Sequence, residues 1–278
     1  MLPKGDVMTN TLVRPPAVAN QFYDGDPVRL NYELGKLIGP VKNPEPAFAV
    51  IAPHAGYIYS GRVAGKAYAK VIVPQNVVIL GPNHTGMGAA TAIMTSGVWA
   101  MPLGNVPVNS ELATQILANS SLLVEDIEAH WHEHSLEVQV PFLQYRQPNL
   151  SIVPICLGHI SYEACEEIGL AIAKAIKAYG QDVLIVASTD LTHYENQKQA
   201  EMKDSLVIDK IMDMDPKGLY ETVLSYGISM CGIMPTTATL VASIALGASQ
   251  SELVAYATSG DITGDYSSVV GYASFLIK

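Results

Sequence analysis

Short apolar runs alternate with stretches of helical periodicity along the whole chain. The runs at residues 47–52, 76–80, 151–156 and 182–187 have the length and composition of buried strands. Strands that alternate with helices are typical of an α/β fold, in which helices flank a mixed or mainly parallel central sheet. No repeat, linker or shift in composition divides the sequence, so we expect one α/β domain over residues 1–278.

Capping residues set the expected helix boundaries. Asp26 followed by Pro27 has the pattern of an N-cap with proline in the first helical position. Ser161 and Gly180 are placed to cap the two ends of the clearest helix, and Ser60 is expected to begin another. The other expected elements are helices at 110–118, 197–212, 216–225 and 236–246, an amphipathic stretch at 134–145 that Pro141 interrupts, and strands at 90–95, 253–258 and 269–277.

The composition excludes several classes of protein. A formal net charge of −10 without a basic stripe would repel a nucleic-acid backbone, so we expect no nucleic-acid partner. The longest apolar stretch, at 238–248, is too short to span a membrane, and the first residues lack the pattern of a secretory signal. The three cysteines do not form a disulfide pattern. We therefore expect a cytoplasmic protein in which residues 1–12, polar and without pattern, are disordered.

Residues that bind metals or transfer protons follow several of the predicted strands. His54 and His84 come just after the first two apolar runs, and Asp190 and His193 follow the run that ends at residue 187. Cys231 opens a turn before a predicted helix. The carboxyl ends of parallel strands meet at one edge of a sheet, where binding sites form. Two imidazoles, a thiol and an Asp/His pair delivered to that edge would make a metal pocket.

Each of these residues also has an ordinary explanation. His54 or His84 alone would as readily hydrogen-bond a loop carbonyl, Asp190 would serve as a helix N-cap, and Cys231 would be an inert buried thiol. The combination is more specific than its members, because four separate placements at strand ends or turns are improbable by chance.

A second set of residues would supply acid–base chemistry. Asp190 and His193 are three residues apart and would share one face of a helical turn. Asp190 would then accept a ring N–H of His193 and leave the other ring nitrogen as a base or ligand. In the one His-dense tract, His134 is expected to face the cleft, whereas His130 and His132 are expected at the surface.

Other motifs add little. The sequence contains no nucleotide-binding glycine motif and no Gly-x-Ser-x-Gly elbow, which argues against a nucleotide site and a serine hydrolase. The Gly- and Asp-rich segment 260–268 is interpreted as a turn between two strands, with Asp265 as a minor site candidate. His159, just after a predicted strand, is another minor candidate.

Five motifs, spread nearly from end to end, carry a family resemblance. They are Pro53-His54-Ala55-Gly56-Tyr57 with Ser60-Gly61, Gly81-Pro82-Asn83-His84, Glu133-His134-Ser135-Leu136-Glu137, Ser188-Thr189-Asp190-Leu191-Thr192-His193-Tyr194, and Cys231-Gly232. On these motifs the chain resembles the Memo family, the Memo-like proteins of the AmmeMemoRadiSam system. The fold of that family is similar to that of the class III non-haem iron extradiol dioxygenases.

The resemblance implies that His54, His84 and Cys231 are the metal-site positions, with Asp190 and His193 in the same pocket. The dioxygenases hold Fe(II) through two histidines and one carboxylate, whereas the third position here is a cysteine. A thiolate is softer and favours Zn or Cu. The resemblance therefore implies a divalent metal ion, Fe(II) first, with Zn or Cu as alternatives, and it does not carry the dioxygenase reaction with it.

The resemblance also implies partners. Prokaryotic members often accompany a radical-SAM protein, which implies a functional link to such a protein. Vertebrate members are described as binding phosphotyrosine peptides in this pocket. In an acidic chain, that activity would require Arg62 or Lys66 to face the pocket.

Two classes of function follow. The first is an Fe(II)-dependent oxygenase or redox enzyme of unknown substrate, in which His193, Asp190 and His134 provide acid–base chemistry and a phenol from Tyr57 or Tyr194 orients the substrate. The second is a non-catalytic module that binds a metal, a small molecule or a (phospho)peptide in the same pocket. The sequence leaves the oligomeric state and the substrate open.

Overall fold

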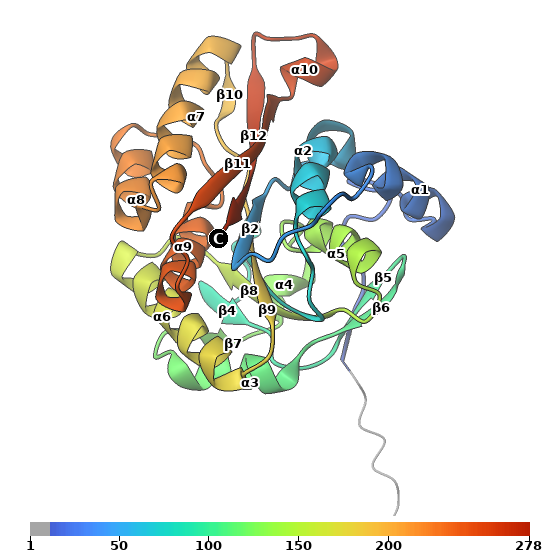
Figure 1. Ribbon diagram of the computed structural model, residues 1–278, viewed down its shortest axis with the longest axis vertical. Coiled ribbons are helices and arrows are strands. Elements are labelled where there is room, and N and C mark those ends of the chain that lie inside the picture. The colour runs from blue at the N-terminus through green and yellow to red at the C-terminus, as the bar shows by residue number, and fades with distance from the viewer. Residues whose placement is uncertain (1–11) are drawn as a thin grey trace, which may run out of the picture.

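A twisted mixed sheet forms the centre of the computed structural model, which describes residues 12–278 (Figure 1). The predicted disorder of residues 1–12 therefore lies outside the described residues except at Leu12. Within the described part, eight of its nine strands follow the order β10-β12-β2-β9-β3-β8-β4-β7, and the ninth, β11, pairs with β12. This arrangement confirms the predicted α/β fold with a mixed sheet.

Four neighbouring parallel strands make the middle of this sheet: β2 (Ala49–Ala52), β9 (Val183–Ser188), β3 (Asn76–Pro82) and β8 (Ser151–Leu157). They are almost wholly buried, as expected for parallel strands covered on both faces. The flanking strands are β12 (Val269–Ile277), β11 (Ser251–Thr258), β10 (His193–Glu195), β4 (Thr91–Ile93) and β7 (Val124–Glu125). A separate small sheet joins β1 (Val13–Arg14), β5 (Val98–Met101) and β6 (Gly104–Pro107).

Helices cover both faces of the sheet. On one face α9 (Ile233–Leu246) contacts β9 and β3 and packs on α6 (Tyr162–Tyr179), which in turn packs on α3 (Ser110–Asn119). On the other side in Figure 1, α2 (Tyr57–Lys70) lies on β2, β11 and β12, with α1 (Pro27–Ile38) beside it. The remaining helices are α4 (Glu128–Trp131), η1 (Glu137–Gln139), α5 (Val140–Arg146), α7 (Gln197–Met212), α8 (Pro216–Ser225) and α10 (Gly260–Thr263).

Most predicted caps are confirmed. The Asp26 carboxylate accepts from the first backbone amides of α1, and the Ser161 hydroxyl accepts from the Ala164 amide at the start of α6. Gly180 ends α6 in the left-handed conformation, with φ at 69°. Ser60 is not a cap, contrary to expectation: α2 begins at Tyr57, and the Ser60 hydroxyl donates to the Ala55 carbonyl at 2.8 Å.

Prolines lie in the first turn of α5 and in the turn between β5 and β6. Near Pro141, where a break or kink was expected, the chain stays helical but changes type: the 3₁₀ turn η1 ends at Gln139 and α5 begins at Val140, with proline in its first turn. The hairpin of β5 and β6 was not predicted. Its two-residue turn is Pro102-Leu103, between the paired residues Met101 and Gly104, and Gly104 has a φ of 118°.

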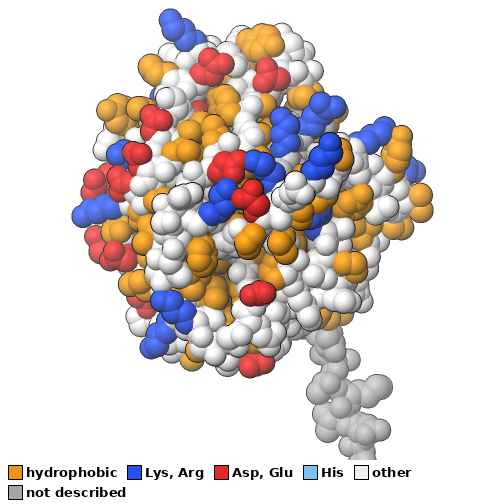
Figure 2. Space-filling model, in the orientation of Figure 1, with side chains coloured by type: hydrophobic (Ala, Val, Ile, Leu, Met, Phe, Trp, Pro, Cys, Tyr) orange, Lys and Arg blue, Asp and Glu red, His pale blue; other side chains and the backbone are white. Residues whose placement is uncertain are grey.

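Charged side chains of both signs are mixed on the face shown in Figure 2. Near the carboxyl-terminal end of β12, the Lys278 amino group lies 3.0 Å from a Glu45 oxygen and 2.9 Å from a Glu252 oxygen, and Lys70 also pairs with Glu252. Among the helices of residues 12–278, none is long and apolar enough to cross a membrane.

A fully buried ion pair fastens the amino-terminal segment to the rest of the fold. The Arg14 guanidinium donates from Nη1 to Glu137 Oε2 at 2.5 Å, and its Nε donates to the His130 carbonyl at 2.7 Å. Its Nη2 donates to the Glu133 carbonyl at 2.7 Å, and the group lies 4.0 Å over the Trp99 ring. The ion pair therefore holds the chain around residues 130–137 in place.

The Glu137 carboxylate is also saturated with donors. It accepts from the backbone amides of Ala17 and Val18 at 2.7 and 3.0 Å and from the Tyr23 hydroxyl at 2.6 Å. A buried charge is tolerated only when it is paired and hydrogen-bonded in this way.

His130, predicted to be at the surface, is wholly buried beside this pair, whereas His132 is exposed as expected. His130 lies on the short helix α4, and its Nδ1–H donates to the Asp126 carbonyl at 2.9 Å. Alternation along the tract gave no sign of which histidine faces inward, because the segment is a short helix and turn and not a strand.

Glu137→Gln should strongly destabilise the fold, because it leaves the Arg14 charge buried without its partner. We expect the free energy of unfolding, from urea denaturation, to fall by about 3–5 kcal/mol. Glu221→Gln is the matched control, since Glu221 lies 4.0 Å from Lys217 on the surface, and its effect should stay within roughly 0.5 kcal/mol. Equal effects of the two substitutions would show that the buried pair contributes nothing special.

His130 should make stability depend on pH. Burial lowers its pKa to about 4, whereas an unfolded histidine titrates near about 6.5. As the pH falls through this window the unfolded chain binds a proton that the folded chain does not. The contribution to stability is therefore complete above about pH 6.5 and is lost toward pH 4.

The His130→Gln variant should lose that dependence and keep a donor for the Asp126 carbonyl. Between pH 7 and 4.5, wild type should lose about 2–3 kcal/mol more unfolding free energy than His130→Gln. His132→Gln, which changes an exposed histidine, should follow wild type. Urea denaturation at a series of pH values measures all three proteins, and parallel curves for wild type and His130→Gln would contradict the assignment.

Candidate metal centre

Three neighbouring strands deliver the predicted residues to one edge of the sheet. His54 follows β2, Asp190 follows β9 and His84 follows β3, in the order in which these strands pair. The register aligns Ala52 with Ser188 at the ends of β2 and β9, so the segments that follow leave the sheet at the same level. The ends of these strands therefore meet at one edge of the sheet, as the sequence predicted.

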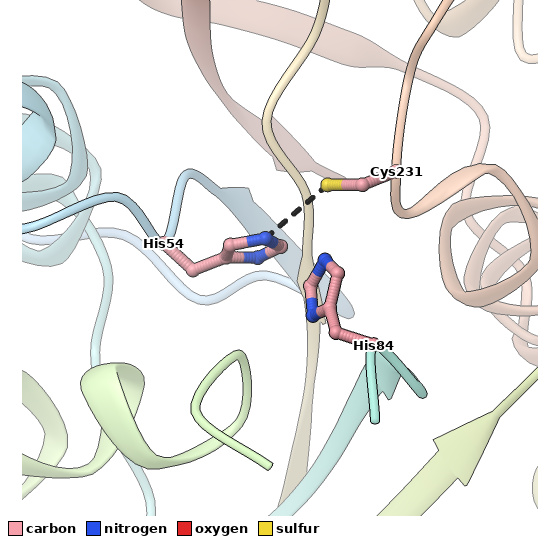
Figure 3. Close-up of side chains that lie close together, drawn as sticks. All are labelled: His54, His84 and Cys231. Carbon is pink, nitrogen blue, oxygen red and sulfur yellow. Dashed lines mark hydrogen bonds between the residues drawn. The ribbon is translucent and has the colours of Figure 1, made fainter. Parts of the chain in front are cut away.

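His54, His84 and Cys231 lie together at this edge (Figure 3). One ligand atom from each residue lies within 4.8 Å of those of the other two, and Cys231 Sγ is 3.2 Å from His54 Nε2. The predicted meeting of the three side chains is confirmed.

Cys231 reaches the site from the turn before α9. The next residue, Gly232, lies so close to the end of β9 that a Cβ atom would be 2.4 Å from the Ser188 carbonyl oxygen. Only glycine fits there, and its amide donates to the Thr189 hydroxyl at 3.0 Å. The Asp190 amide donates to Cys231 Sγ at 3.3 Å, and burial raises the pKa of this thiol well above its ordinary value.

His54 is a buried, neutral imidazole. Burial lowers its pKa well below the ordinary value, and repulsion from His134 and His84 lowers it further. Its Nδ1 lies 2.9 Å from the Ser188 hydroxyl, on the side of the ring opposite Cys231. A neutral ring is the form that binds metals.

A buried carboxylate holds His84. Glu133 Oε1 lies 2.9 Å from His84 Nδ1, and its Oε2 accepts from the His84 backbone amide at 2.6 Å. Because a carboxylate only accepts, Nδ1 carries the proton and Nε2 presents a lone pair. Burial would raise the pKa of Glu133, but the hydrogen bonds from His84 and Ser135 outweigh it and hold the pKa at about 2. No role was predicted for Glu133 from the sequence, although the residue lies in the His-dense tract and in one of the five motifs.

His134 faces the cluster, as predicted. Its ring stacks on that of His84 with centroids 4.6 Å apart, and the His54 centroid is 5.5 Å away. Burial lowers the pKa of His134. His84, Glu133 and His134 form a second group with ligand atoms within 4.8 Å. Glu133 already accepts three N–H groups, from His84 twice and from Ser135, so its role in the structure is to orient His84.

The predicted contact between Asp190 and the His193 ring is absent. Asp190 Oδ1 accepts from the backbone amides of His54 and Ala55 at 2.7 and 3.3 Å, and burial raises the Asp190 pKa to about 6. His193 Nδ1 instead donates to the Ser229 carbonyl at 2.9 Å, which leaves Nε2 with a lone pair. The prediction assumed a helical turn, but His193 begins the extended strand β10, where residues three apart do not share a face.

Other candidates lie outside the cluster. His159 and Asp265 are exposed and belong to neither of these two groups. The Tyr57 hydroxyl points inward and donates to the Val138 carbonyl at 2.7 Å, whereas Tyr194 is exposed and has a φ of 61°.

The two cations considered for phosphopeptide binding are exposed side chains of α2. Arg62 lines a groove of about 670 Å³ between α1 and α2, and Lys66 is exposed. Phe22, whose ring lies 4.9 Å from that of His134, also lines this groove. One aromatic side chain therefore borders both the groove and the histidine cluster.

Comparisons with known proteins agree with the motifs. The family model described as Memo-like protein matches residues 14–276. A MEMO1 family protein from Methanopyrus kandleri is 46% identical over 279 residues, which cover 95% of this chain and 99% of the relative. A MEMO1 family protein from Methanothermobacter thermautotrophicus is 45% identical over 274 residues, which cover 94% of this chain and 99% of the relative.

A solved structure shares the fold. The crystal structure of an uncharacterized protein from Escherichia coli K12 matches 82% of this chain and 98% of its own, with a TM-score of 0.51 and 12% identity. At that identity the likeness concerns the fold alone. The family model covers residues 14–276, a range in which the whole histidine and cysteine cluster lies, and the two relatives are similar over 94–95% of this chain. The chain therefore belongs to the Memo family.

Proposed function

We propose that His54, His84 and Cys231 bind a divalent metal ion, with Fe(II) as first choice and Zn or Cu as alternatives. The observation that carries the proposal is the meeting of three ligand atoms from three separate segments within 4.8 Å. Ligands bonded to an ion at about 2.0–2.3 Å lie roughly 3–4 Å from one another. The 3.2 Å between Cys231 Sγ and His54 Nε2 is in that range.

The chemistry of the donor set fits a reactive metal centre. Both imidazoles present nitrogen to the cluster, and the thiol becomes a strong ligand once it loses its proton. Structural zinc sites use four protein ligands, whereas a three-ligand set leaves a position for substrate. Imidazole suits Fe, Zn and Cu alike, and the thiolate favours the softer ions, so metal analysis must decide among them.

Two further histidines suited to proton transfer, His134 and His193, support an enzyme. A bound metal would act as a Lewis acid on a substrate oxygen. The His193 Nδ1–H donates to the Ser229 carbonyl, so the Nε2 lone pair is left to take a proton from a substrate hydroxyl. His134, stacked on His84, is placed to hydrogen-bond the same substrate. We infer an oxygenase or related redox enzyme that uses O₂ and acts on a small molecule.

The alternative is a non-catalytic module that binds a metal or a (phospho)peptide. Its support is the groove that adjoins the cluster through Phe22 and carries Arg62. We also propose a cytoplasmic location, since Cys156, Cys165 and Cys231 are all free thiols, as a reducing compartment favours. A functional link to a radical-SAM protein is proposed from the family alone.

His54→Ala, His84→Ala and Cys231→Ala should each abolish metal retention. After anaerobic reconstitution with Fe(II), Zn(II) or Cu(II) and desalting, elemental analysis should find about one ion per wild-type chain. Each variant should bind at least roughly 100-fold more weakly, because each loses a ligand. His159→Ala is the matched control, and circular dichroism checks that the variants fold. Unchanged metal content in His54→Ala would refute the assignment.

Turnover distinguishes the enzyme from the binding module. Fe(II)-loaded protein should consume oxygen with one or more members of a catechol panel and release an oxidised product. His193→Gln should keep its metal and lose roughly 10²–10⁴-fold in rate, as expected for removal of a general base. His159→Gln should leave the rate unchanged. Tight metal binding without oxygen uptake across the panel would favour the module.

A further inference from the structure

Three polar side chains lie wholly buried behind the metal centre, in line from the core to His54. They are Tyr68 on α2, Gln139 at the end of η1 and Ser188 at the end of β9. Buried polar groups are costly unless every donor and acceptor is satisfied, so the direction of each hydrogen bond can be worked out by accounting. These hydrogen bonds determine which ring nitrogen of His54 carries the proton.

The orientation of the Gln139 amide is fixed at both ends. Its Nε2 lies 2.9 Å from the Pro53 carbonyl oxygen, an acceptor, so this atom must be the donor nitrogen. Its Oε1 accepts from the Tyr68 hydroxyl at 2.9 Å. The second proton of Nε2 is then directed to the Ser188 hydroxyl at 2.8 Å.

The Ser188 hydroxyl has one proton and two lone pairs. The proton goes to the Ser135 carbonyl at 2.6 Å, because that oxygen can only accept. One lone pair receives the Gln139 amide. The remaining neighbour is His54 Nδ1 at 2.9 Å, and the only bond left for Ser188 to make is to accept from it.

We propose that Gln139 and Ser188 are positioning residues that hold His54 in the Nδ1–H tautomer, so that its Nε2 lone pair faces Cys231. Figure 3 shows the ring with this nitrogen toward the sulfur. The inference rests on the proposed metal site and deepens it. The carboxylate of Glu133 fixes His84 in the same tautomer, so the two imidazoles offer equivalent nitrogens by different means.

The tautomer is directly measurable in the metal-free protein. With ¹⁵N-labelled histidine, long-range ¹⁵N–¹H correlation spectra distinguish Nδ1–H from Nε2–H rings, and His54→Gln identifies the His54 signals. Wild type should show His54 as the Nδ1–H form. Ser188→Ala and Gln139→Met should shift it toward a mixture or toward Nε2–H. A wild-type ring found in the Nε2–H form would overturn the inference without any variant.

Metal affinity provides the second readout. Ser188→Ala and Gln139→Met should bind Zn(II) about 10–100-fold more weakly than wild type in a chelator competition, the usual effect of losing a group that orients a ligand. Ser274→Ala is the matched control. Ser274 is a buried serine on β12, and its hydroxyl donates to the Val63 carbonyl at 2.8 Å. If Gln139→Met kept both the Zn(II) affinity and the His54 tautomer of wild type, the inference would be overturned. This test holds even if Ser188→Ala fails to fold. Absence of metal binding in wild type would instead refute the proposed function.

Discussion

The shared register of β2, β9 and β3 is the constraint on which the site depends. Parallel pairing aligns Ala52 with Ser188, and Leu80 on β3 with Ala187, so the three strands end at one level. Hydrogen bonds along buried strands are obligatory, and a slip of one residue would turn every side chain to the opposite face. Side chains far apart in the sequence are thereby brought close together without any direct sequence signal between them.

The buried ion pair of Arg14 and Glu137 is a second constraint on the site. Arg14 donates to the Glu133 carbonyl and pairs with the Glu137 side chain. It therefore holds both ends of the segment from Glu133 to Glu137. That segment carries the carboxylate that orients His84 and the carbonyl that receives the Ser188 proton. Desolvating two charges costs free energy, but the pair holds this segment in place beside His54 and His84.

The sequence was enough to predict the α/β fold, most helix caps and the meeting of His54, His84 and Cys231, because strand ends and capping residues are local signals. It could not predict that Glu133 hydrogen-bonds His84, or that Ser188 and Gln139 form a hydrogen-bonded chain to His54. Their roles arise from contacts between segments that no spacing rule connects. The Asp190 and His193 pairing failed for the same reason: its spacing is local, but the extended backbone of β10 was set by pairing with β12.

The position of Cys231 just before α9 has a consequence for the whole fold. An ion shared by Cys231 and the two histidines would join the start of α9 to the ends of β2 and β3. These three segments are far apart in the sequence. The bound ion would act as a reversible cross-link between them. Because it binds only the native state, it would shift the folding equilibrium toward that state. Metal supply in the cell would then govern the lifetime of the polypeptide as well as its chemistry.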